Sequence, residues 1–422
     1  MPEASGLSTT LPRPLVERPT HHTYSVGVIT LALRLLQKTD IGLTTCRKAL
    51  HSIISLFDPT SRVPCRSTIA NWRDKFGYQA CRSSSFSSSS SWAVLVDESI
   101  TLGGNKILLI LGVDLSRYDF TAPLCFSDVE VLDVGFQPGW KAEQIAQRLQ
   151  DIQDQGIRIA YGVTDRAPNL VRAFRDSELC WLEDCSHAVA KCLEKTYVKD
   201  ADFVAFEKAC TQMKRKGSIS RYAHLLPPKL GAHSRFMNID KGVKWAQKTL
   251  KLLEQHGDDQ QVAPYATHLQ WLSDHRDTVE QLTKSIQLSS HLLKQMKTGG
   301  FNPERYPALV EYVDAADVPT ILKDRLLNYL SELHRTTQAA GGKYICSTDV
   351  VESLFSVTKA NAHLQHDRLK ELLYCRIKPI EPEQTKQRME AITLRLLAQY
   401  RADSQTVPTT AQRRAAVYNL VR

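Results

Sequence analysis

The sequence feature that most limits the fold is an aspartate inside an apolar, strand-forming run. Asp97 follows Val94, Leu95 and Val96, and no turn residue interrupts the run. A carboxylate in a buried strand is costly unless a partner neutralises its charge, and a divalent metal ion is a common partner. The adjacent Glu98 points to the opposite face, although a one-residue error in register would exchange the two. Asp97 is therefore the first candidate metal ligand.

Two further acidic residues complete a possible ligand set. Asp165 ends the apolar run of residues 159–164, and Glu352 lies in a segment with helical periodicity that starts near residue 348. The helix places Glu352 and Lys359 on one stripe, away from the apolar residues that pack inward. If the three carboxylates converge, they form a site for Mg²⁺ or Mn²⁺. Two such ions, held roughly 4 Å apart, perform phosphodiester chemistry.

The second and third carboxylates also have structural interpretations. Asp349 and Glu352 have the spacing of a capping box, with Asp349 as the N-cap of the helix and Glu352 folding back onto its start. Asp165 precedes Arg166-Ala-Pro and has the position of a turn residue that caps the next helix. The apolar run before Asp97 contains no turn, so a structural interpretation as a turn residue does not apply to Asp97.

Charge and composition narrow the class of partner. The 422 residues carry a net charge of +9, with a pI near 9.0, which favours a polyanionic partner. No apolar run approaches the roughly 20 residues of a membrane span, and the N-terminus lacks the order of a secretory signal. We expect a cytoplasmic, nucleoid-associated protein with no membrane partner.

The ten cysteines are scattered and include no Cys-x-x-Cys pair, so neither a disulfide framework nor an ordinary zinc finger is indicated. The tightest group is Cys180, Cys185, His187 and Cys192. A zinc site is one interpretation of this group. The alternative, which the strand pattern of residues 180–187 favours, is that free cysteines serve as small core residues.

The N-terminal part has the pattern of a helix-turn-helix module. Residues 1–23 lack periodicity and are expected to be a disordered leader, and residues 24–80 contain two amphipathic helices, broken around residues 39–42, and a third helix over residues 67–77. In this third helix Gly77 is the expected stop. A Ser-rich linker, residues 81–91, follows. The alternative is an ordinary three-helix bundle with a solvated basic face. The polar residues expected to enter a major groove are Arg66, Asn71, Arg73 and Lys75.

The remaining chain predicts an α/β fold: an RNase H-like mixed sheet with a helical insertion. Residues 93–100, 106–114 and 123–132 are expected to be antiparallel strands, residues 140–155 a crossover helix, and residues 157–164 a strand parallel to the first. A helix, a fifth strand and another helix follow over residues 168–175, 179–186 and 187–197. The predicted domains are residues 92–199 as the first part of the catalytic core, residues 200–342 as an all-helical insertion, and residues 343–422 as the helix carrying Glu352 with C-terminal helices.

Several sequence blocks resemble the DDE transposases of bacterial insertion sequences. They are Val94-Leu-Val-Asp-Glu98, Gly162-Val-Thr-Asp-Arg-Ala167, Asp184-Cys-Ser-His187 and Ser347-Thr-Asp-Val-Val-Glu-Ser-Leu-Phe-Ser-Val-Thr-Lys359. The last block is similar to a Glu-Ser-Leu-Phe-Gly-x-x-Lys element of such enzymes, although Ser356 stands where that element has glycine.

The resemblance implies a two-metal site with catalytic ligands Asp97, Asp165 and Glu352, and a helix-turn-helix domain that binds terminal repeats. Double-stranded DNA, as element ends and target, would be the substrate of a homo-oligomer in a synaptic complex. Arg166, Lys191 and Lys359 would neutralise phosphates. Two alternatives stay open: an RNase H-like nuclease or recombinase that cleaves without integrating, and a catalytically silent DNA-binding regulator.

Overall fold

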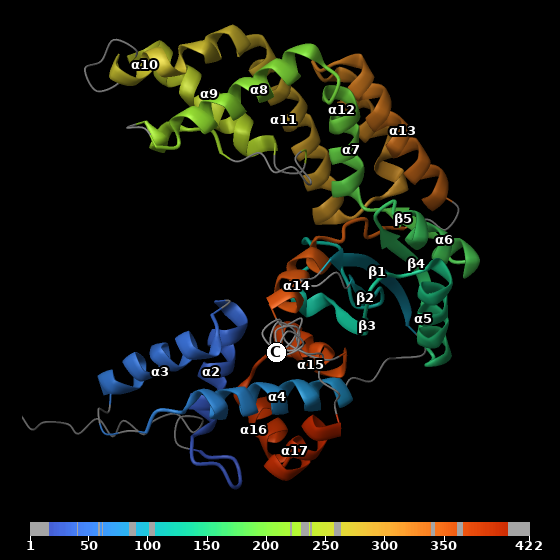
Figure 1. Ribbon diagram of the computed structural model, residues 1–422. Helices are drawn as coiled ribbons and strands as arrows, with labels where there is room; N and C mark the ends of the chain where they lie inside the picture. The colour runs from blue at the N-terminus through green and yellow to red at the C-terminus, as the bar shows by residue number, and fades with distance from the viewer. Residues whose placement is uncertain are drawn as a thin grey trace, which may run out of the picture. The chain divides into compact units, whose positions relative to one another are not determined.

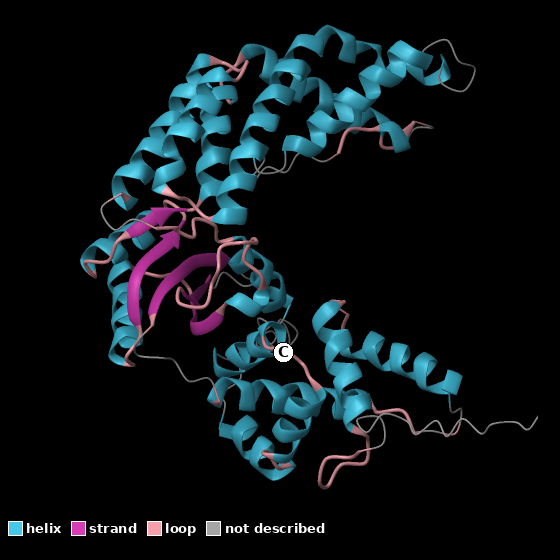
Figure 2. Ribbon diagram, turned by 180° about the vertical axis from the view of Figure 1, so that it is seen from behind, coloured by secondary structure: helices cyan, strands magenta, loops and turns pink. Residues whose placement is uncertain are grey.

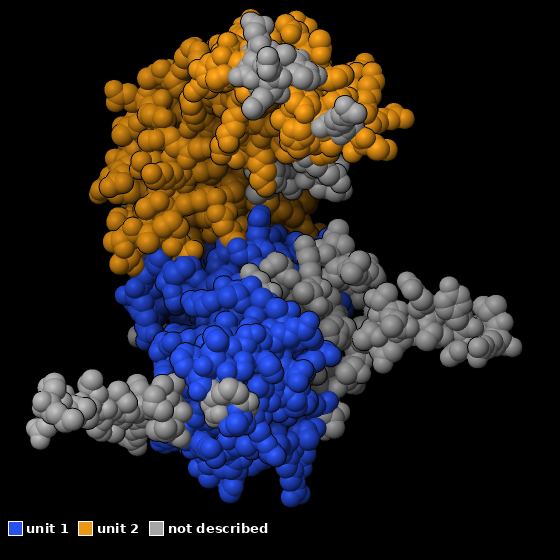
Figure 3. Space-filling view, turned by 90° about the vertical axis from the view of Figure 1, so that its left-hand side faces the viewer, with its two compact units in different colours: residues 1–118, 125–160, 350–422 blue, residues 119–124, 161–349 orange. Residues whose placement is uncertain are grey.

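The computed structural model describes residues 17–39, 41–57, 60, 62–83, 90–100, 106–219, 222–228, 236, 239–256, 263–338, 342–360 and 366–403. Within them the protein is a mixed α/β structure, with one five-stranded sheet and many helices (Figures 1 and 2). The chain divides into two compact units (Figure 3). Unit 1 contains residues 1–118, 125–160 and 350–422, and unit 2 contains residues 119–124 and 161–349.

The sheet has the strand order β3-β2-β1-β4-β5. Its first three strands are an antiparallel meander, and β4 pairs in parallel with β5. The predicted order, in which a fourth strand adds beside the first, is therefore found. The strands are β1 (Ser91–Ile100), β2 (Lys106–Asp114), β3 (Glu130–Gln137), β4 (Arg158–Thr164) and β5 (Trp181–Glu183).

Two strands differ in extent from the prediction. β3 begins at Glu130 rather than at Pro123, because a proline cannot donate a ladder hydrogen bond and Phe126–Asp128 forms the 3₁₀ segment η1. β5 is short, because Asp184 already caps the next helix. The predicted turn at Gly103-Gly104 lies outside the described residues.

Unit 1 combines its strands with helices from both ends of the chain. The predicted break between the first two helices is found between α2 and α3. Ile29, Leu33, Leu50 and Ile69 have no more than 2% of their surface exposed and form part of its core. The helices are α2 (Val26–Lys38), α3 (Leu43–Phe57), α4 (Arg66–Arg82), α5 (Ala142–Asp154), α15 (His366–Ile377), α16 (Pro382–Glu390) and α17 (Leu394–Asp403), together with most of α14 (Asp349–Ala360).

Gly77 does not end α4, as the sequence predicted, but lies inside it. A Cβ atom at Gly77 would come within 2.3 Å of the backbone oxygen of Glu371 in α15. The missing side chain therefore allows two helices to pack closely, and α4 continues to Arg82. As a result, Cys81 and Arg82 of the predicted linker are helical, and Ser91 begins β1; residues 84–89 lie outside the described part of the chain.

Residues 17–23, predicted as part of a disordered leader, are held against α16. The backbone N–H and the hydroxyl of Thr20 both donate to Glu390, at 2.8 and 3.0 Å. Glu17 forms an ion pair with Lys386 at 2.6 Å, and Pro19 is buried. The prediction failed because these partners lie more than 360 residues away in sequence. Residues 1–16 lie outside the described residues.

Unit 2 is mainly helical. Between α7 and α14 the described residues form helices, as the periodicity predicted, together with one isolated bridge between Phe301 and Tyr344. No helix in the described part of the chain is long and apolar enough to cross a membrane. The elements are α6 (Pro168–Asp176), α7 (Cys185–Tyr197), α8 (Ala201–Gly217), η2 (Ala223–Leu225), α9 (Ile239–His256), α10 (Ala263–Leu269), η4 (Gln270–His275), α11 (Arg276–Gly299), η5 (Pro303–Arg305), α12 (Tyr306–Ala315) and α13 (Thr320–Thr337).

Candidate functional site

Asp97 lies in β1 directly after its fully buried stretch. Its side chain is half-buried, whereas Leu95 and Val96 have no exposed surface. One oxygen of the Asp97 carboxylate accepts the N–H of Glu98 at 2.7 Å. The carboxylate of Glu98 is instead ion-paired with Lys106 on β2, at 2.8 Å. Glu98 therefore has a lysine as its counter-ion, and Asp97 stays the better candidate ligand.

Asp165 follows directly after β4. One of its carboxylate oxygens accepts the N–H of Ala167 at 2.9 Å, just before α6 begins at Pro168. This hydrogen bond confirms the turn that the sequence suggested as an alternative, but Asp165 does not cap α6, whose N-cap is Ala167. The turn also fixes the direction of the Asp165 side chain. One of its carboxylate oxygens accepts a single hydrogen bond there, from the N–H of Ala167.

Glu352 is exposed on α14, while Val351 and Leu354 on the same helix have no exposed surface. The packing side predicted for this helix is therefore confirmed. The capping box stays a prediction, although α14 begins at Asp349 itself. The Asp349 carboxylate accepts the hydroxyl of Ser186 at 3.0 Å and pairs with Lys297.

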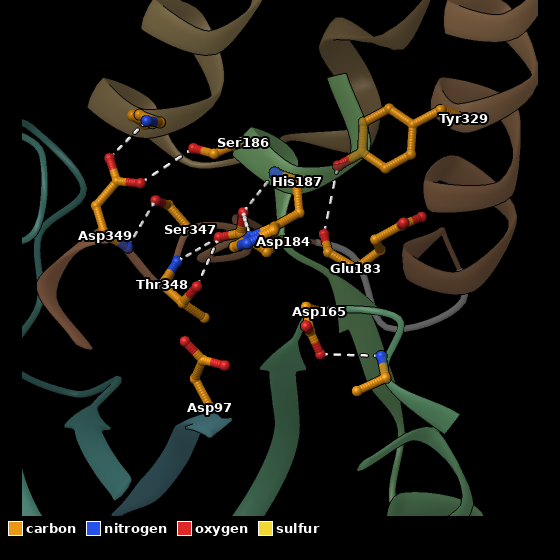
Figure 4. A network of polar contacts seen from close by, with 12 residues as sticks. Asp97, Asp165, Glu183, Asp184, Ser186, His187, Tyr329, Ser347, Thr348 and Asp349 are labelled. Atoms are coloured by element: carbon orange, nitrogen blue, oxygen red, sulfur yellow. Dashed lines mark hydrogen bonds and ion pairs between the residues drawn. The ribbon is translucent and has the colours of Figure 1, made fainter. Parts of the chain in front are cut away.

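The residue that the sequence analysis missed is Asp184 (Figure 4). One oxygen of its carboxylate accepts the backbone N–H of His187 at 2.8 Å and lies 3.0 Å from Nδ1 of the same residue. The other oxygen accepts the N–H and the hydroxyl of Thr348, at 2.6 and 2.9 Å. With a side chain 1% exposed, Asp184 joins the starts of α7 and α14.

Asp184 is fully paired despite its burial. Burial raises its pKa, but the hydrogen bonds and charge of His187 and the bond from Thr348 outweigh burial and hold the pKa below its ordinary value. His187 lies in the first turn of α7, which begins at Cys185, two residues before the start of the predicted helix of residues 187–197. The sequence did hold a signal, since aspartate after a short strand and before a helical period is a preferred N-cap.

Arg166, which the sequence predicted to neutralise phosphates, lies between two carboxylates. Its guanidinium pairs with Glu183 at 2.7 Å and with Glu332 at 2.5 Å, so two carboxylates already compensate its charge. Burial raises the pKa of Glu183 above its ordinary value, although Arg166 and Lys191 act against that rise. Arg166, Glu183 and Glu332 line a cavity of about 290 Å³, together with Cys180, Trp181, Leu182, Tyr329, Leu333, Arg335 and Thr336.

The polar face predicted for α4 is largely occupied by protein contacts. Lys75 is 3% exposed, and its ammonium lies 3.3 Å from the backbone oxygen of Met389. Burial lowers the pKa of Lys75. Arg73 pairs with Asp74 at 3.0 Å. Asn71 accepts a hydrogen bond from Arg401 at 2.9 Å, and of the four predicted DNA-reading residues Arg66 alone is exposed.

The chemistry of the three predicted ligands suits a hard divalent ion, since carboxylate oxygens are what Mg²⁺ and Mn²⁺ prefer. Among the described residues, however, no three histidine, cysteine, aspartate or glutamate side chains form a group that could hold a metal ion. The same finding applies to Cys180, Cys185, His187 and Cys192. The side chain of Lys359 lies outside the described residues, and Lys191 is exposed on α7.

Comparisons with known proteins give weak structural likeness and no sequence match. No family model matches the chain, and no curated protein sequence matches it. Among solved structures, the Drosophila P element transposase strand transfer complex is similar over 88% of this chain and 97% of that chain, with 13% sequence identity and a TM-score of 0.39. A likeness at this level does not identify a family.

Proposed function

We propose that this chain is a DNA transposase that binds terminal repeats, cleaves DNA strands and transfers them. The observation that carries the proposal is the sheet order β3-β2-β1-β4-β5, with Asp97 in β1 and Asp165 directly after β4. Three antiparallel strands followed by a strand that adds beside the first is the order of an RNase H-like core. Acidic residues on neighbouring strands of such a core suit phosphodiester chemistry that depends on divalent ions.

Glu352 is the proposed third carboxylate of a DDE triad. Its helix buries Val351 and Leu354 and leaves Glu352 exposed, so the carboxylate is not needed for packing. The three residues would hold two Mg²⁺ or Mn²⁺ ions, which supply an activated oxygen nucleophile and stabilise the leaving 3′ oxygen. Since no ready group of three ligands exists among the described residues, metal binding needs its own measurement.

The proposed DNA-binding surface of the N-terminal helices is smaller than the sequence suggested. Recognition helices contact bases mainly through their N-terminal residues. Arg66 and Ser67 are exposed at the start of α4, which has no acidic residue in its first turn. We propose that this end reads terminal DNA, and that Lys191 and Lys359 contact phosphates of the element or target. Pairing of two DNA ends implies a homo-oligomer.

Cleavage of a plasmid tests the proposal. The substrate is a supercoiled plasmid that carries the genomic DNA flanking the coding sequence of this chain, incubated with the full chain in Mg²⁺, Mn²⁺ or EDTA. We expect nicked and joined products with either metal, none in EDTA, and none from Asp97→Asn. Cleavage in EDTA, or by Asp97→Asn, contradicts the proposal. Nicking without strand transfer favours a nuclease, and binding without nicking favours a silent regulator.

A further inference from the structure

Helix α9 in unit 2 carries a stripe of lysines. Lys241, Lys244, Lys248 and Lys251 are all exposed and follow each other at intervals of three, four and three residues, which places them along one side of the helix. At 1.5 Å per residue the stripe is about 15 Å long. A nucleic-acid strand advances by about 3.4 Å per nucleotide even when stacked as in B-DNA, so the stripe spans several phosphates.

The acidic neighbours of the stripe are already engaged. Asp240 pairs with Lys244 at 3.0 Å, and both side chains are substantially exposed. Such a surface pair stabilises a protein by well under about 1 kcal/mol, so Lys244 can exchange it for a phosphate. Glu254, at the other end of the helix, pairs with Arg276. The stripe therefore offers positive charge along its whole length once Lys244 exchanges Asp240 for a phosphate.

Aromatic rings lie beside the lysines. Trp245 is four residues after Lys241 and three before Lys248, so it borders the stripe on α9. Its ring stacks on Trp271 of η4, with centroids 6.4 Å apart, and its indole N–H donates to Leu225 in η2 at 2.9 Å. Both tryptophans are half-buried.

Four more rings continue this group between η2 and α10. Tyr222 stacks on His268 with centroids 4.3 Å apart, and His224 meets Tyr265 edge-on at 5.6 Å. The two histidines are exposed and the two tyrosines are half-buried. We call these six rings, from Tyr222, His224, Trp245, Tyr265, His268 and Trp271, the aromatic ladder. Figure 1 shows α9 and α10 at the end of the helical group that lies away from β5.

Trp271 gives a second indication that the ladder is not only a core. Its indole N–H is buried, yet it has no hydrogen-bond partner among the described residues, unlike the N–H of Trp245. Burying an unpaired donor costs about 1–3 kcal/mol. An unpaired indole N–H is costly in a core, and the half-exposed ring of Trp271, rather than its buried N–H, is the part that a stacked base would contact.

We infer that the lysine stripe and the aromatic ladder form a binding surface for single-stranded nucleic acid. Lysines along a groove follow the backbone, and rings beside them stack on bases, which is the combination used by proteins that bind single strands without sequence preference. A duplex keeps its bases stacked inside, so it can use the lysines but not the rings. This inference deepens the proposed function, on which its role in strand transfer rests, but the binding itself requires neither metal nor carboxylates.

The test measures fluorescence anisotropy of a labelled 20-nucleotide oligothymidylate with the full chain in EDTA, from 50 to 200 mM salt. The wild type should bind the oligothymidylate more tightly than a 20-base-pair duplex. Lys244→Gln with Lys248→Gln should weaken binding and lower the slope of log affinity against log salt by about 1.4, because each lost phosphate contact contributes about 0.7. The matched control, Lys195→Gln with Lys294→Gln, changes the same charge on α7 and α11 and should leave binding unchanged.

Trp271→Leu tests the rings separately. The loss of one stacked base should weaken oligothymidylate binding by about 5- to 150-fold, with an unchanged salt slope. If the lysine pair variant binds oligothymidylate like the wild type, or if it loses duplex binding as much as oligothymidylate binding, the inference is overturned. If Trp271→Leu does not fold, the comparison of the lysine pair variant with its matched control still decides the test. The two tests are independent, because oligothymidylate binding is measured in EDTA and nicking requires a metal ion. Oligothymidylate binding without plasmid nicking contradicts only the proposed function. Plasmid nicking without oligothymidylate binding contradicts only the inference.

Discussion

Thr348 donates two hydrogen bonds to one oxygen of the buried Asp184, from its backbone N–H at 2.6 Å and its hydroxyl at 2.9 Å (Figure 4). The two residues are 164 positions apart in sequence. The other oxygen of Asp184 caps α7 through the N–H of His187. One negative charge thus serves the starts of two helices, where helix dipoles favour an anion.

Asp184→Asn should destabilise unit 2 by about 3 kcal/mol. An amide has one accepting oxygen, so its NH₂ group would face donors of either His187 or Thr348, and at least one buried donor would lose its partner. Urea unfolding followed by circular dichroism measures the change. Thr348→Val is the matched variant, because it removes the hydroxyl and keeps the N–H; we expect a loss of about 1–2 kcal/mol. An Asp184→Asn protein as stable as the wild type would show that the carboxylate charge is not needed.

Glu183 and Asp184 should give stability opposite dependences on pH. The pKa of Asp184 is lowered, so its stabilisation is present above the unfolded pKa near 3.9 and is lost as the pH falls through the lower folded value. The pKa of Glu183 is raised by burial, so the folded state binds its proton more tightly. The contribution of Glu183 therefore falls as the pH rises from about 4.3 through its folded pKa.

Glu183→Gln should accordingly raise the free energy of unfolding at pH 7 and have less effect at pH 4. Arg166 keeps Glu332 as a partner in this variant, so it is not left alone. The deficit of Asp184→Asn should instead shrink at pH 3. Urea titrations at three pH values measure both differences. Parallel pH profiles for the two variants would contradict the assigned directions.

Gly77→Ala should destabilise the protein although alanine is the better helix former. The added methyl group would lie 2.3 Å from the Glu371 backbone oxygen, and α4 and α15 would have to separate, at a cost of about 1–3 kcal/mol. Gly299→Ala, in the last turn of α11, is the control, because its nearest neighbour would be a flexible Arg305 side chain at 4.0 Å. We expect that variant to keep or slightly raise the melting temperature. Equal melting temperatures for the two variants would show that α15 does not need the space.

Arg66→Ala should weaken binding of the full chain to terminal duplex DNA and lower the salt slope by about 1, whereas Lys75→Met should not. Lys75 is buried against Met389, so the change affects packing rather than a DNA contact. The full chain is required, because α4 packs against α15, α16 and α17, which an N-terminal fragment lacks. Filter binding at a temperature where both variants are folded makes the comparison. A large loss for Lys75→Met and none for Arg66→Ala would reverse the assignment.

The sequence predicted the elements whose pattern is local. β2 and the break between α2 and α3 were predicted correctly, and β1 and β4 nearly so, because alternation and helical periods are visible within a single segment. The burial of the polar face of α4 was not predicted, because the helices that cover Asn71 and Lys75 follow roughly 300 residues later in the sequence. Nothing near α4 in the sequence reports that distant packing.

The candidate site shows the same limit. Asp97 and Asp165 could be selected from their own strands, since an acidic residue in or after an apolar run is visible locally. The pairing of Arg166 with Glu332 could not be predicted, because the two residues are 166 positions apart in sequence. Asp184 was not selected as a site residue, because its role depends on hydrogen bonds from the distant Thr348. A polar network between distant segments leaves no periodic pattern in the sequence.

Asp97→Asn, Asp165→Asn and Glu352→Gln should each abolish Mg²⁺-dependent nicking of the plasmid. A proposed ligand set that loses one carboxylate cannot hold both ions, so a double variant should be about as inactive as a single one. Each variant should still bind terminal DNA. Mg²⁺ should raise the melting temperature of the wild type, because a ligand of the folded state stabilises it, but should not raise that of the variants.

Glu98→Gln is the matched control for this last prediction. It lies next to Asp97 and changes the same charge, but Glu98 pairs with Lys106 across the hairpin, so the variant should keep nicking activity and lose a little stability. Each variant is assayed for nicking rate and melting temperature, with and without Mg²⁺. Full activity in Glu352→Gln would remove that residue from the site. Loss of activity in Glu98→Gln with retention in Asp97→Asn would show that the opposite face of β1 carries the chemistry.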